Sequence, residues 1–154
     1  MPVKWPTPGA DSHTTIVMRA RFCETDQMGV IHHAVYLTYF EAARIEYLRR
    51  RGAEYRLWME RGAHLAVAES QVRHKRPLRF DDRFVIEISL IELGRASARF
   101  SYRLVREGAE AEVVAEGATL LACVNNEGAI RLIPEELAAS LCGPELTPRP
   151  PDQA

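Results

Sequence analysis

Residues 21–52 read RFCETDQMGVIHHAVYLTYFEAARIEYLRRRG, and the rest of the chain is organised around this stretch. An alternating run ends at Phe22, and a polar segment that holds Asp26 and Gly29 then turns the chain. A long apolar helical pattern begins near His33. Because the start of a helix carries unpaired backbone N–H groups and a partial positive charge, this spacing predicts a carboxylate beside such a start.

The helical pattern extends over residues 33–51. One apolar stripe recurs at helical spacing: Tyr36, Phe40, Ala43 and Tyr47. Further apolar positions widen that surface: Leu37, Ile45 and Leu48. Charge spacing predicts two ion pairs, Glu41 with Arg44 and Glu46 with Arg50. Arginines in the last turn and the glycine at position 52 predict that the helix ends at Arg51. A helix this apolar needs cover on more than one side, and a curved sheet is the expected cover.

The remaining chain alternates apolar and polar residues with the period of half-buried strands. Predicted strands cover residues 14–22, 65–75, 84–93, 96–104 and 113–124, with a short edge strand at 130–133. Short helices are predicted at 54–60 and between Pro134 and Gly143. Consecutive hairpins imply a mainly antiparallel sheet with helices on one face. We therefore predict an α+β fold, in which an antiparallel sheet wraps around one long central helix.

The two ends of the chain are rich in proline, with three prolines in residues 1–12 and four in residues 144–154. Such segments cannot bury enough apolar surface to offset the entropy of ordering them. We therefore predict disordered tails at both ends and a single domain over residues 13–143. A chain of 154 residues has room for one such core.

Composition narrows the functional classes. Hydrophobic residues make up 47% and charged residues 27%, as in a globular protein, and a net charge of −1 gives no general attraction for nucleic acid or an anionic membrane. The three cysteines lack metal-ligand spacing, and their odd number suits no disulfide framework. No stretch resembles a secretion signal or a membrane span. We expect a cytoplasmic protein without membrane insertion or nucleic-acid partners.

Asp26 has two compatible interpretations. An Asp followed three residues later by Gly29 is typical of a type I turn, in which the carboxylate accepts a backbone hydrogen bond. The functional interpretation is a base or nucleophile, held ionised beside the helix start. A carboxylate that faces unpaired N–H groups across a gap is suited to hydrolysis of a carbonyl compound.

Other polar residues of the stretch give weaker signals. His32 and His33 are adjacent and point about 100° apart on a helix, so they cannot chelate one metal from the same face. No Glu or Cys joins them at ligand spacing, and we expect no metal site. His33 is either a general acid or a helix-start residue that acts through its backbone N–H. Glu41 and Glu46 are explained more simply by ion pairs than by catalysis.

Basic clusters at residues 49–51 and 73–76 are ordinarily solvated surface, and they could also bind the phosphates of a nucleotide-bearing ligand. The chain has neither a glycine-rich phosphate loop nor a dinucleotide fingerprint. We therefore expect no bound cofactor.

Residues 24–52 resemble the acyl-CoA thioesterases of the hotdog fold, in particular the 4-hydroxybenzoyl-CoA thioesterase branch and its bacterial Tol-Pal-associated relatives. The family signature is an Asp, a Gly three residues later and a Tyr ten residues after the Asp. Asp26, Gly29 and Tyr36 match it, and His33 lies seven residues after the Asp. PLRFDDRFVIEI at 77–88 and the LGRAS turn at 93–97 resemble the second strand pair of the family. The resemblance covers about residues 15–134.

The resemblance implies an acyl-CoA thioesterase that hydrolyses a thioester to free acid and coenzyme A. Asp26 would act as nucleophile or general base, and the backbone N–H of His33 would polarise the thioester oxygen. Substrate-binding positions carried over are Gly29, Val30, Tyr36 and Arg95. Arg95 and the basic run at 73–76 would contact phosphates of coenzyme A, which is part of the substrate and not a cofactor. Family members are dimers or tetramers with each site at a subunit boundary, so we expect a homo-oligomer and, of the two states, a homotetramer.

The sequence departs from the family pattern at two positions. Several relatives carry a Tyr where Phe22 stands, and a small residue is frequent where Met28 stands. Another hotdog branch uses a Glu on the long helix as its catalytic residue, so Glu41 stays open as an alternative catalytic residue. Two other classes also stay open, a binding-only acyl-CoA domain and a hotdog dehydratase that acts on hydroxyacyl thioesters. The acyl group and the carrier, coenzyme A or acyl carrier protein, are left undetermined.

Overall fold

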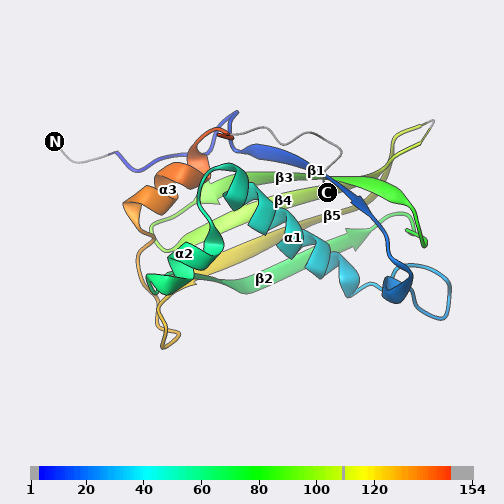
Figure 1. Cartoon of the computed structure of the whole chain (residues 1–154), viewed down its shortest axis with the longest axis horizontal. Helices are drawn as coiled ribbons and strands as arrows, with labels where there is room; N and C mark the ends of the chain where they lie inside the picture. Colours follow the sequence, from blue (N-terminus) through cyan, green and yellow to red (C-terminus); the bar gives the residue numbers. More distant parts are fainter. Residues whose placement is uncertain (1–3, 109, 147–154) are drawn as a thin grey trace.

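The structure, a computed structural model, describes residues 4–108 and 110–146. In chain order its elements are β1 (His13–Arg19), the 3-10 helix η1 (Phe22–Glu24), α1 (Val35–Arg50), α2 (Tyr55–Glu60), β2 (His64–His74), β3 (Arg83–Leu93), β4 (Ser97–Arg106), β5 (Glu112–Val124) and α3 (Glu135–Cys142). This order of one strand, one long helix and then hairpin strands confirms the predicted α+β class (Figure 1).

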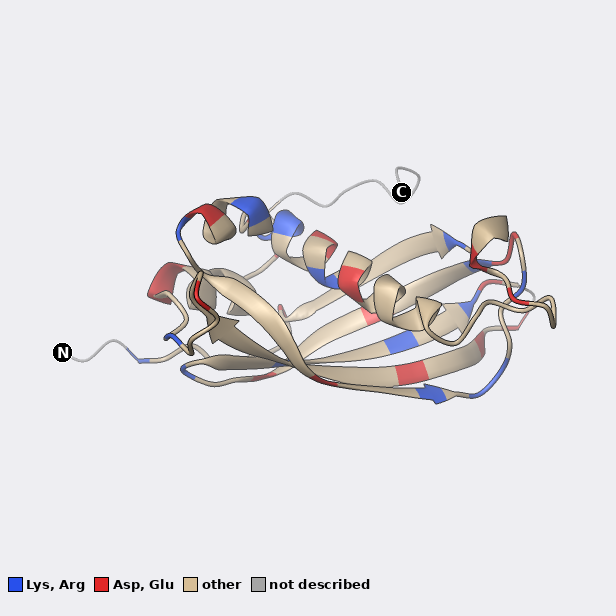
Figure 2. Ribbon diagram, turned by 90° about the horizontal axis from the view of Figure 1, so that it is seen from below, with Lys and Arg blue, Asp and Glu red and all other residues tan. Residues whose placement is uncertain are grey.

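The five strands form one antiparallel sheet in the order β1-β3-β4-β5-β2. The strands β1 and β2, which flank the long helix in the sequence, are therefore the two edges of the sheet. The helix α1 lies along one side of the curved sheet, as the side-on view in Figure 2 shows. The predicted arrangement of a sheet around one long helix is confirmed.

The apolar stripe of α1 faces the sheet and forms the centre of the core. All four predicted stripe residues are buried: Tyr36, Phe40, Ala43 and Tyr47. Phe40 stacks on Tyr102 of β4 with ring centroids 4.1 Å apart. Gly117 of β5 lies beneath this ring, and a Cβ there would meet Phe40 at 2.5 Å. The glycine therefore permits the close approach of α1 to the sheet.

The other sides of α1 are less covered than expected. Leu37 is exposed and Ile45 half-buried within the chain. Of the two predicted ion pairs, Glu46 with Arg50 is confirmed at 3.2 Å. The pair between Glu41 and Arg44 is wrong for the described structure, because Arg44 instead donates to the hydroxyl of Tyr102 at 3.0 Å.

Two of the predicted strands differ from the observed structure. The first strand ends at Arg19 and does not reach Phe22. The reason is that the Glu24 carboxylate accepts a hydrogen bond from the backbone N–H of Arg21, and the chain forms η1 there. The predicted edge strand at 130–133 is an irregular extended segment, in which Ile130 forms a single bridge with Val124.

Residues 4–12, which belong to the predicted N-terminal tail, lie against the domain. The indole of Trp5 donates to the carbonyl of Leu93 at 3.2 Å, and Arg51 donates to the carbonyl of Asp11 at 2.6 Å. At the other end, Leu146 N–H donates to the carbonyl of Arg50. Residues 1–3 and 147–154 of the predicted tails lie outside the described residues. Within residues 4–108 and 110–146, no helix combines the length and the apolar character needed to cross a membrane.

Candidate active site

The polar segment before α1 is a short hairpin closed by backbone bonds. Thr25 bridges Ile31, and the N–H of Asp26 donates to the carbonyl of Val30 at 2.9 Å. Gly29 N–H donates back to the carbonyl of Asp26 at 3.0 Å, and Gly29 has φ of 75°, which glycine adopts without strain. The predicted turn between Asp26 and Gly29 is therefore present.

The side chain of Asp26 is half-buried and takes part in this turn through one oxygen only. Its Oδ1 accepts a hydrogen bond from the N–H of Met28 at 2.8 Å. Among the described residues, none donates to Oδ2. One oxygen thus fixes the orientation of the carboxylate while the other stays available. The structural interpretation of Asp26 is confirmed, and the functional interpretation is compatible with it.

The helix begins at Val35, two residues later than predicted, after a turn in which a histidine side chain binds the backbone. Nδ1 of His32 accepts from the N–H of Ala34 at 3.1 Å, and the carbonyl of His32 accepts from Val35 at 3.0 Å. The N–H of His33 has no acceptor in the part of the chain that the structure describes. The rings of His32 and His33 stack at 4.2 Å. The N–H of His33 is therefore a main-chain donor at the opening of α1.

Sequence reasoning missed a buried carboxylate, Glu24, that joins the turn to α1. It is 8% exposed and accepts from the N–H of Arg21 at 2.7 Å and from the hydroxyl of Tyr39 at 2.9 Å. Its backbone carbonyl accepts from the N–H of His32 at 2.9 Å. Burial and the bond to Glu24 raise the pKa of Tyr39, so the phenol stays a donor. The available sequence signal was partial: Glu24 has the position of the Glu in a capping box, but Arg21 is not the Ser or Thr of that motif.

Asp26 and the helix opening share one cavity of about 320 Å³. Its lining brings together most of the predicted site: Asp26, Val30, His33 and Tyr36, with Met28 and Ile31 beside them. Tyr36 is 2% exposed, and burial raises the pKa of its phenol. The ring of His74, at the end of β2, contacts the Tyr36 ring edge-on with centroids 4.7 Å apart.

Part of the cavity lining is basic, since it includes His74, Lys75 and Arg76. Lys75 pairs with Glu116 at 3.1 Å and Arg76 with Glu112 at 3.2 Å, both on the surface. Exposed pairs of this kind contribute little to stability and are screened by salt. The predicted basic run thus lies beside the Asp26 cavity, where an anionic group would meet it.

Arg95 is not brought to this cavity within the chain. It lies in the turn between β3 and β4, where its guanidinium stacks on Trp5 at 4.4 Å. That turn contacts Cys123, which pairs with Leu65 at the start of β2, whereas His74 ends the same strand. Arg95 and Asp26 therefore lie at opposite ends of the sheet (Figure 1). Gly29 also does not line the cavity, although it shapes the turn that does.

The two departures from the family pattern lie at the rim of the site. Phe22 is 74% exposed and packs edge-on against Phe80 at 5.6 Å, so its ring is outside the cavity. Met28 lines the cavity and is largely exposed. In residues 4–108 and 110–146, no group of three His, Cys, Asp or Glu side chains is arranged to hold a metal ion.

The fold and the site together define a class: a sheet around one helix, with a carboxylate and the start of that helix lining one cavity. The Thioesterase-like superfamily matches residues 20–141. Over 108 residues the chain is 30% identical to the acyl-CoA thioester hydrolase YbgC of Escherichia coli O157:H7, which covers 70% of this chain and 79% of that protein. The chain therefore belongs to the thioesterase-like, or hotdog, superfamily, and is a thioester hydrolase.

Solved structures of similar proteins have the same fold. A hypothetical protein from Thermus thermophilus is 36% identical with a TM-score of 0.77, and the match covers 84% of this chain and 95% of that one. The DHNA-CoA thioesterase from Staphylococcus aureus is 27% identical with a TM-score of 0.72, covering 79% of each chain. The predicted hotdog fold is confirmed.

Proposed function

We propose that the protein is an acyl-CoA thioesterase in which Asp26 and the N–H of His33 act on one thioester group. The observation that carries the proposal is one cavity lined by both Asp26 and His33; among the described residues, none donates to Oδ2 of Asp26 and none accepts from the N–H of His33. The name of the Escherichia coli relative, an acyl-CoA thioester hydrolase, supports the same substrate class.

The geometry supports two routes. In the first, Asp26 attacks the thioester carbonyl, the thiolate leaves as coenzyme A, and water cleaves the resulting anhydride to the free acid. In the second, Asp26 takes a proton from water, which attacks the same carbon. In both, the N–H of His33 donates to the oxygen on which negative charge develops. Both routes consume one water and need no cofactor.

Substrate contacts follow from the cavity walls. Val30 and Tyr36 would contact the reacting group, and Gly29 would hold the turn. The basic wall at 74–76 would meet the phosphates of coenzyme A. Arg95 serves as a phosphate contact only if a second copy brings it to the cavity. The proposed assembly is therefore a homo-oligomer, dimer or tetramer, in the cytoplasm, with no nucleic-acid partner and no membrane insertion.

A thiol-release assay over a panel of acyl-CoA thioesters tests this function. Aromatic, short-chain and medium-chain substrates are included, because the acyl group is undetermined. We expect release of free coenzyme A with at least one of them. Tight binding without release would favour an acyl-CoA-binding domain, and loss of water from a hydroxyacyl substrate without thiol release would favour a dehydratase.

A further inference from the structure

The hairpin that carries Asp26 rests on the segment that joins β2 to β3, residues 75–82, which we call the β2–β3 link. The N–H of Ile31 in the hairpin donates to the carbonyl of Leu78 in the link at 2.8 Å. The side chain of Leu78 is fully buried, and hairpin and link lie at the same end of the sheet (Figure 1). The position of the Asp26 carboxylate therefore depends on where the link lies.

Arg106, the last residue of β4, holds the link. Its Nη2 donates to the carbonyl of Pro77, and its Nη1 lies 3.7 Å from Oδ2 of Asp82. The same oxygen of Asp82 accepts from the N–H of Arg79 at 2.8 Å. One planar guanidinium thus joins two points of the link that lie on either side of Leu78.

A carboxylate at the start of β5 completes the surroundings of Arg106. Oε2 of Glu112 lies 3.9 Å from Nε of Arg106, and Oε1 of Glu112 pairs with Arg76 at 3.2 Å. Nε of Arg106 is buried and has no hydrogen-bond acceptor among the described residues. Because a buried donor without an acceptor is unfavourable, stability alone does not explain this arrangement.

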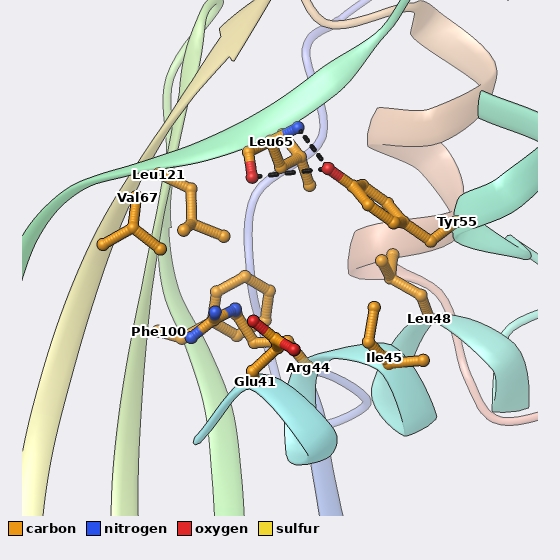
Figure 3. A pocket seen from close by; sticks show the side chains of 9 residues that line it. All are labelled: Glu41, Arg44, Ile45, Leu48, Tyr55, Leu65, Val67, Phe100 and Leu121. Carbon is orange, nitrogen blue, oxygen red and sulfur yellow. Dashed lines mark hydrogen bonds between the residues drawn. The ribbon is translucent and has the colours of Figure 1, made fainter. Parts of the chain in front are cut away.

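Arg106 lies near the proposed site but outside its lining. It lines neither the Asp26 cavity nor the cavity of about 450 Å³ between α1, α2 and β2 that Figure 3 shows. Burial raises the pKa of Tyr36, which lines the Asp26 cavity, and the charge of Arg106 opposes this shift. Arg106 is therefore close to the site without being placed to contact a ligand in either cavity.

We propose that Arg106 is a positioning residue: it fixes the β2–β3 link, and the link holds the carboxylate of Asp26 in place for catalysis. This inference deepens the proposed function and rests on it. A displacement of a reacting group by about 1 Å can reduce a rate by about 10²-fold. Loss of Arg106 should therefore affect the rate of the reaction more than the affinity for substrate.

Three variants test this role in the thiol-release assay. Arg106→Lys keeps the charge but loses the planar fork of donors, and Arg106→Gln loses both. We expect kcat to fall by about 10–100-fold in both, with KM changed by less than about threefold. Arg103→Gln is the matched control on the same strand, because Arg103 pairs with Glu87 at 3.1 Å and lines neither cavity. Its kcat should stay unchanged.

Amide hydrogen exchange followed by NMR gives a readout that needs no turnover. If Arg106 holds the link, the N–H of Ile31 should exchange at least about tenfold faster in Arg106→Gln than in Arg103→Gln. The N–H of Tyr47, in the buried part of α1, should exchange alike in both variants, which distinguishes a local change from a general loss of stability. Arg106→Lys serves for the same measurement if Arg106→Gln does not fold.

Four outcomes overturn the proposal: equal exchange of the Ile31 N–H in the Arg106 and Arg103 variants, faster exchange with kcat unchanged, equally faster exchange at Ile31 and Tyr47, and a rise in KM with kcat intact. Full activity of Arg106→Lys would also overturn it, because the charge and not the fork would then act. Absence of thiol release by the wild-type protein would instead contradict the proposed function. The exchange measurement would then still decide whether Arg106 holds the link.

Discussion

At the scale of single residues, the proposed site depends on the different roles of the two carboxylate oxygens of Asp26. Oδ1 accepts a hydrogen bond from the N–H of Met28, and this bond fixes the orientation of the carboxylate without a second side chain. The other group of the proposed site, the N–H of His33, belongs to the main chain. The proposed chemistry therefore depends on one side chain and one peptide group.

His33→Ala separates the ring from the backbone donor. Because the N–H survives this change, we expect kcat to fall by less than about tenfold, whereas loss of a general acid typically costs about 10²–10⁴. Steady-state thiol release measures the effect. A loss as large as that caused by removing the Asp26 carboxylate would assign the catalytic role to the imidazole ring instead.

Tyr39→Phe tests the buried bond that ties the turn to α1. The phenol donates to Glu24 at 2.9 Å, so its loss leaves a buried carboxylate short of a donor. We expect a decrease of about 1.5–3 kcal/mol in the free energy of unfolding, measured with urea. In Tyr39→Phe, the added Glu24→Gln change should cost less than it does alone, because the two residues share one bond. Strictly additive costs would contradict this coupling.

At the scale of elements, the contact of α1 with the sheet depends on one glycine. A methyl group at Gly117 would overlap Phe40 and the carbonyl of Gln71, at 2.5 and 2.6 Å. We expect Gly117→Ala to lower the free energy of unfolding by about 1–3 kcal/mol, as overpacking does. Gly9→Ala is the control, since nothing lies within 4 Å of its Cβ position. Equal effects of the two changes would exclude a close helix–sheet approach as the cause.

The end of α1 gives a dependence of stability on pH. Burial alone would raise the pKa of Glu46, but hydrogen bonds from Arg49 and Arg50 lower it below its ordinary value. A pKa that is lower in the folded state gives stability above the unfolded-state value, and this stability is lost as pH falls through the folded-state value. Glu46→Gln should therefore destabilise the protein at pH 7 and much less at about pH 3. Urea unfolding at both values is the measurement, and equal losses would contradict the assignment.

At the scale of the whole molecule, sequence patterns predicted the architecture because burial of α1 dictates it. The stripe from Tyr36 to Tyr47 and the alternating strands specify both layers, and the Asp26–Gly29 spacing located the turn. Periodicity could not predict that Glu24 would end the first strand early, since an alternating pattern does not show that the Glu24 carboxylate accepts the N–H of Arg21. Nor could it place Arg95, because strand order decides which end of the sheet a turn occupies.

The substitution Asp26→Asn tests the central claim most directly, since it keeps the shape of the side chain and its Oδ1 acceptor. With the best substrate of the panel, we expect kcat for thiol release to fall by at least about 10²–10⁴. The free energy of unfolding and the oligomeric mass should stay unchanged. A folded variant that keeps most of its activity would contradict the assignment of the reaction to this carboxylate.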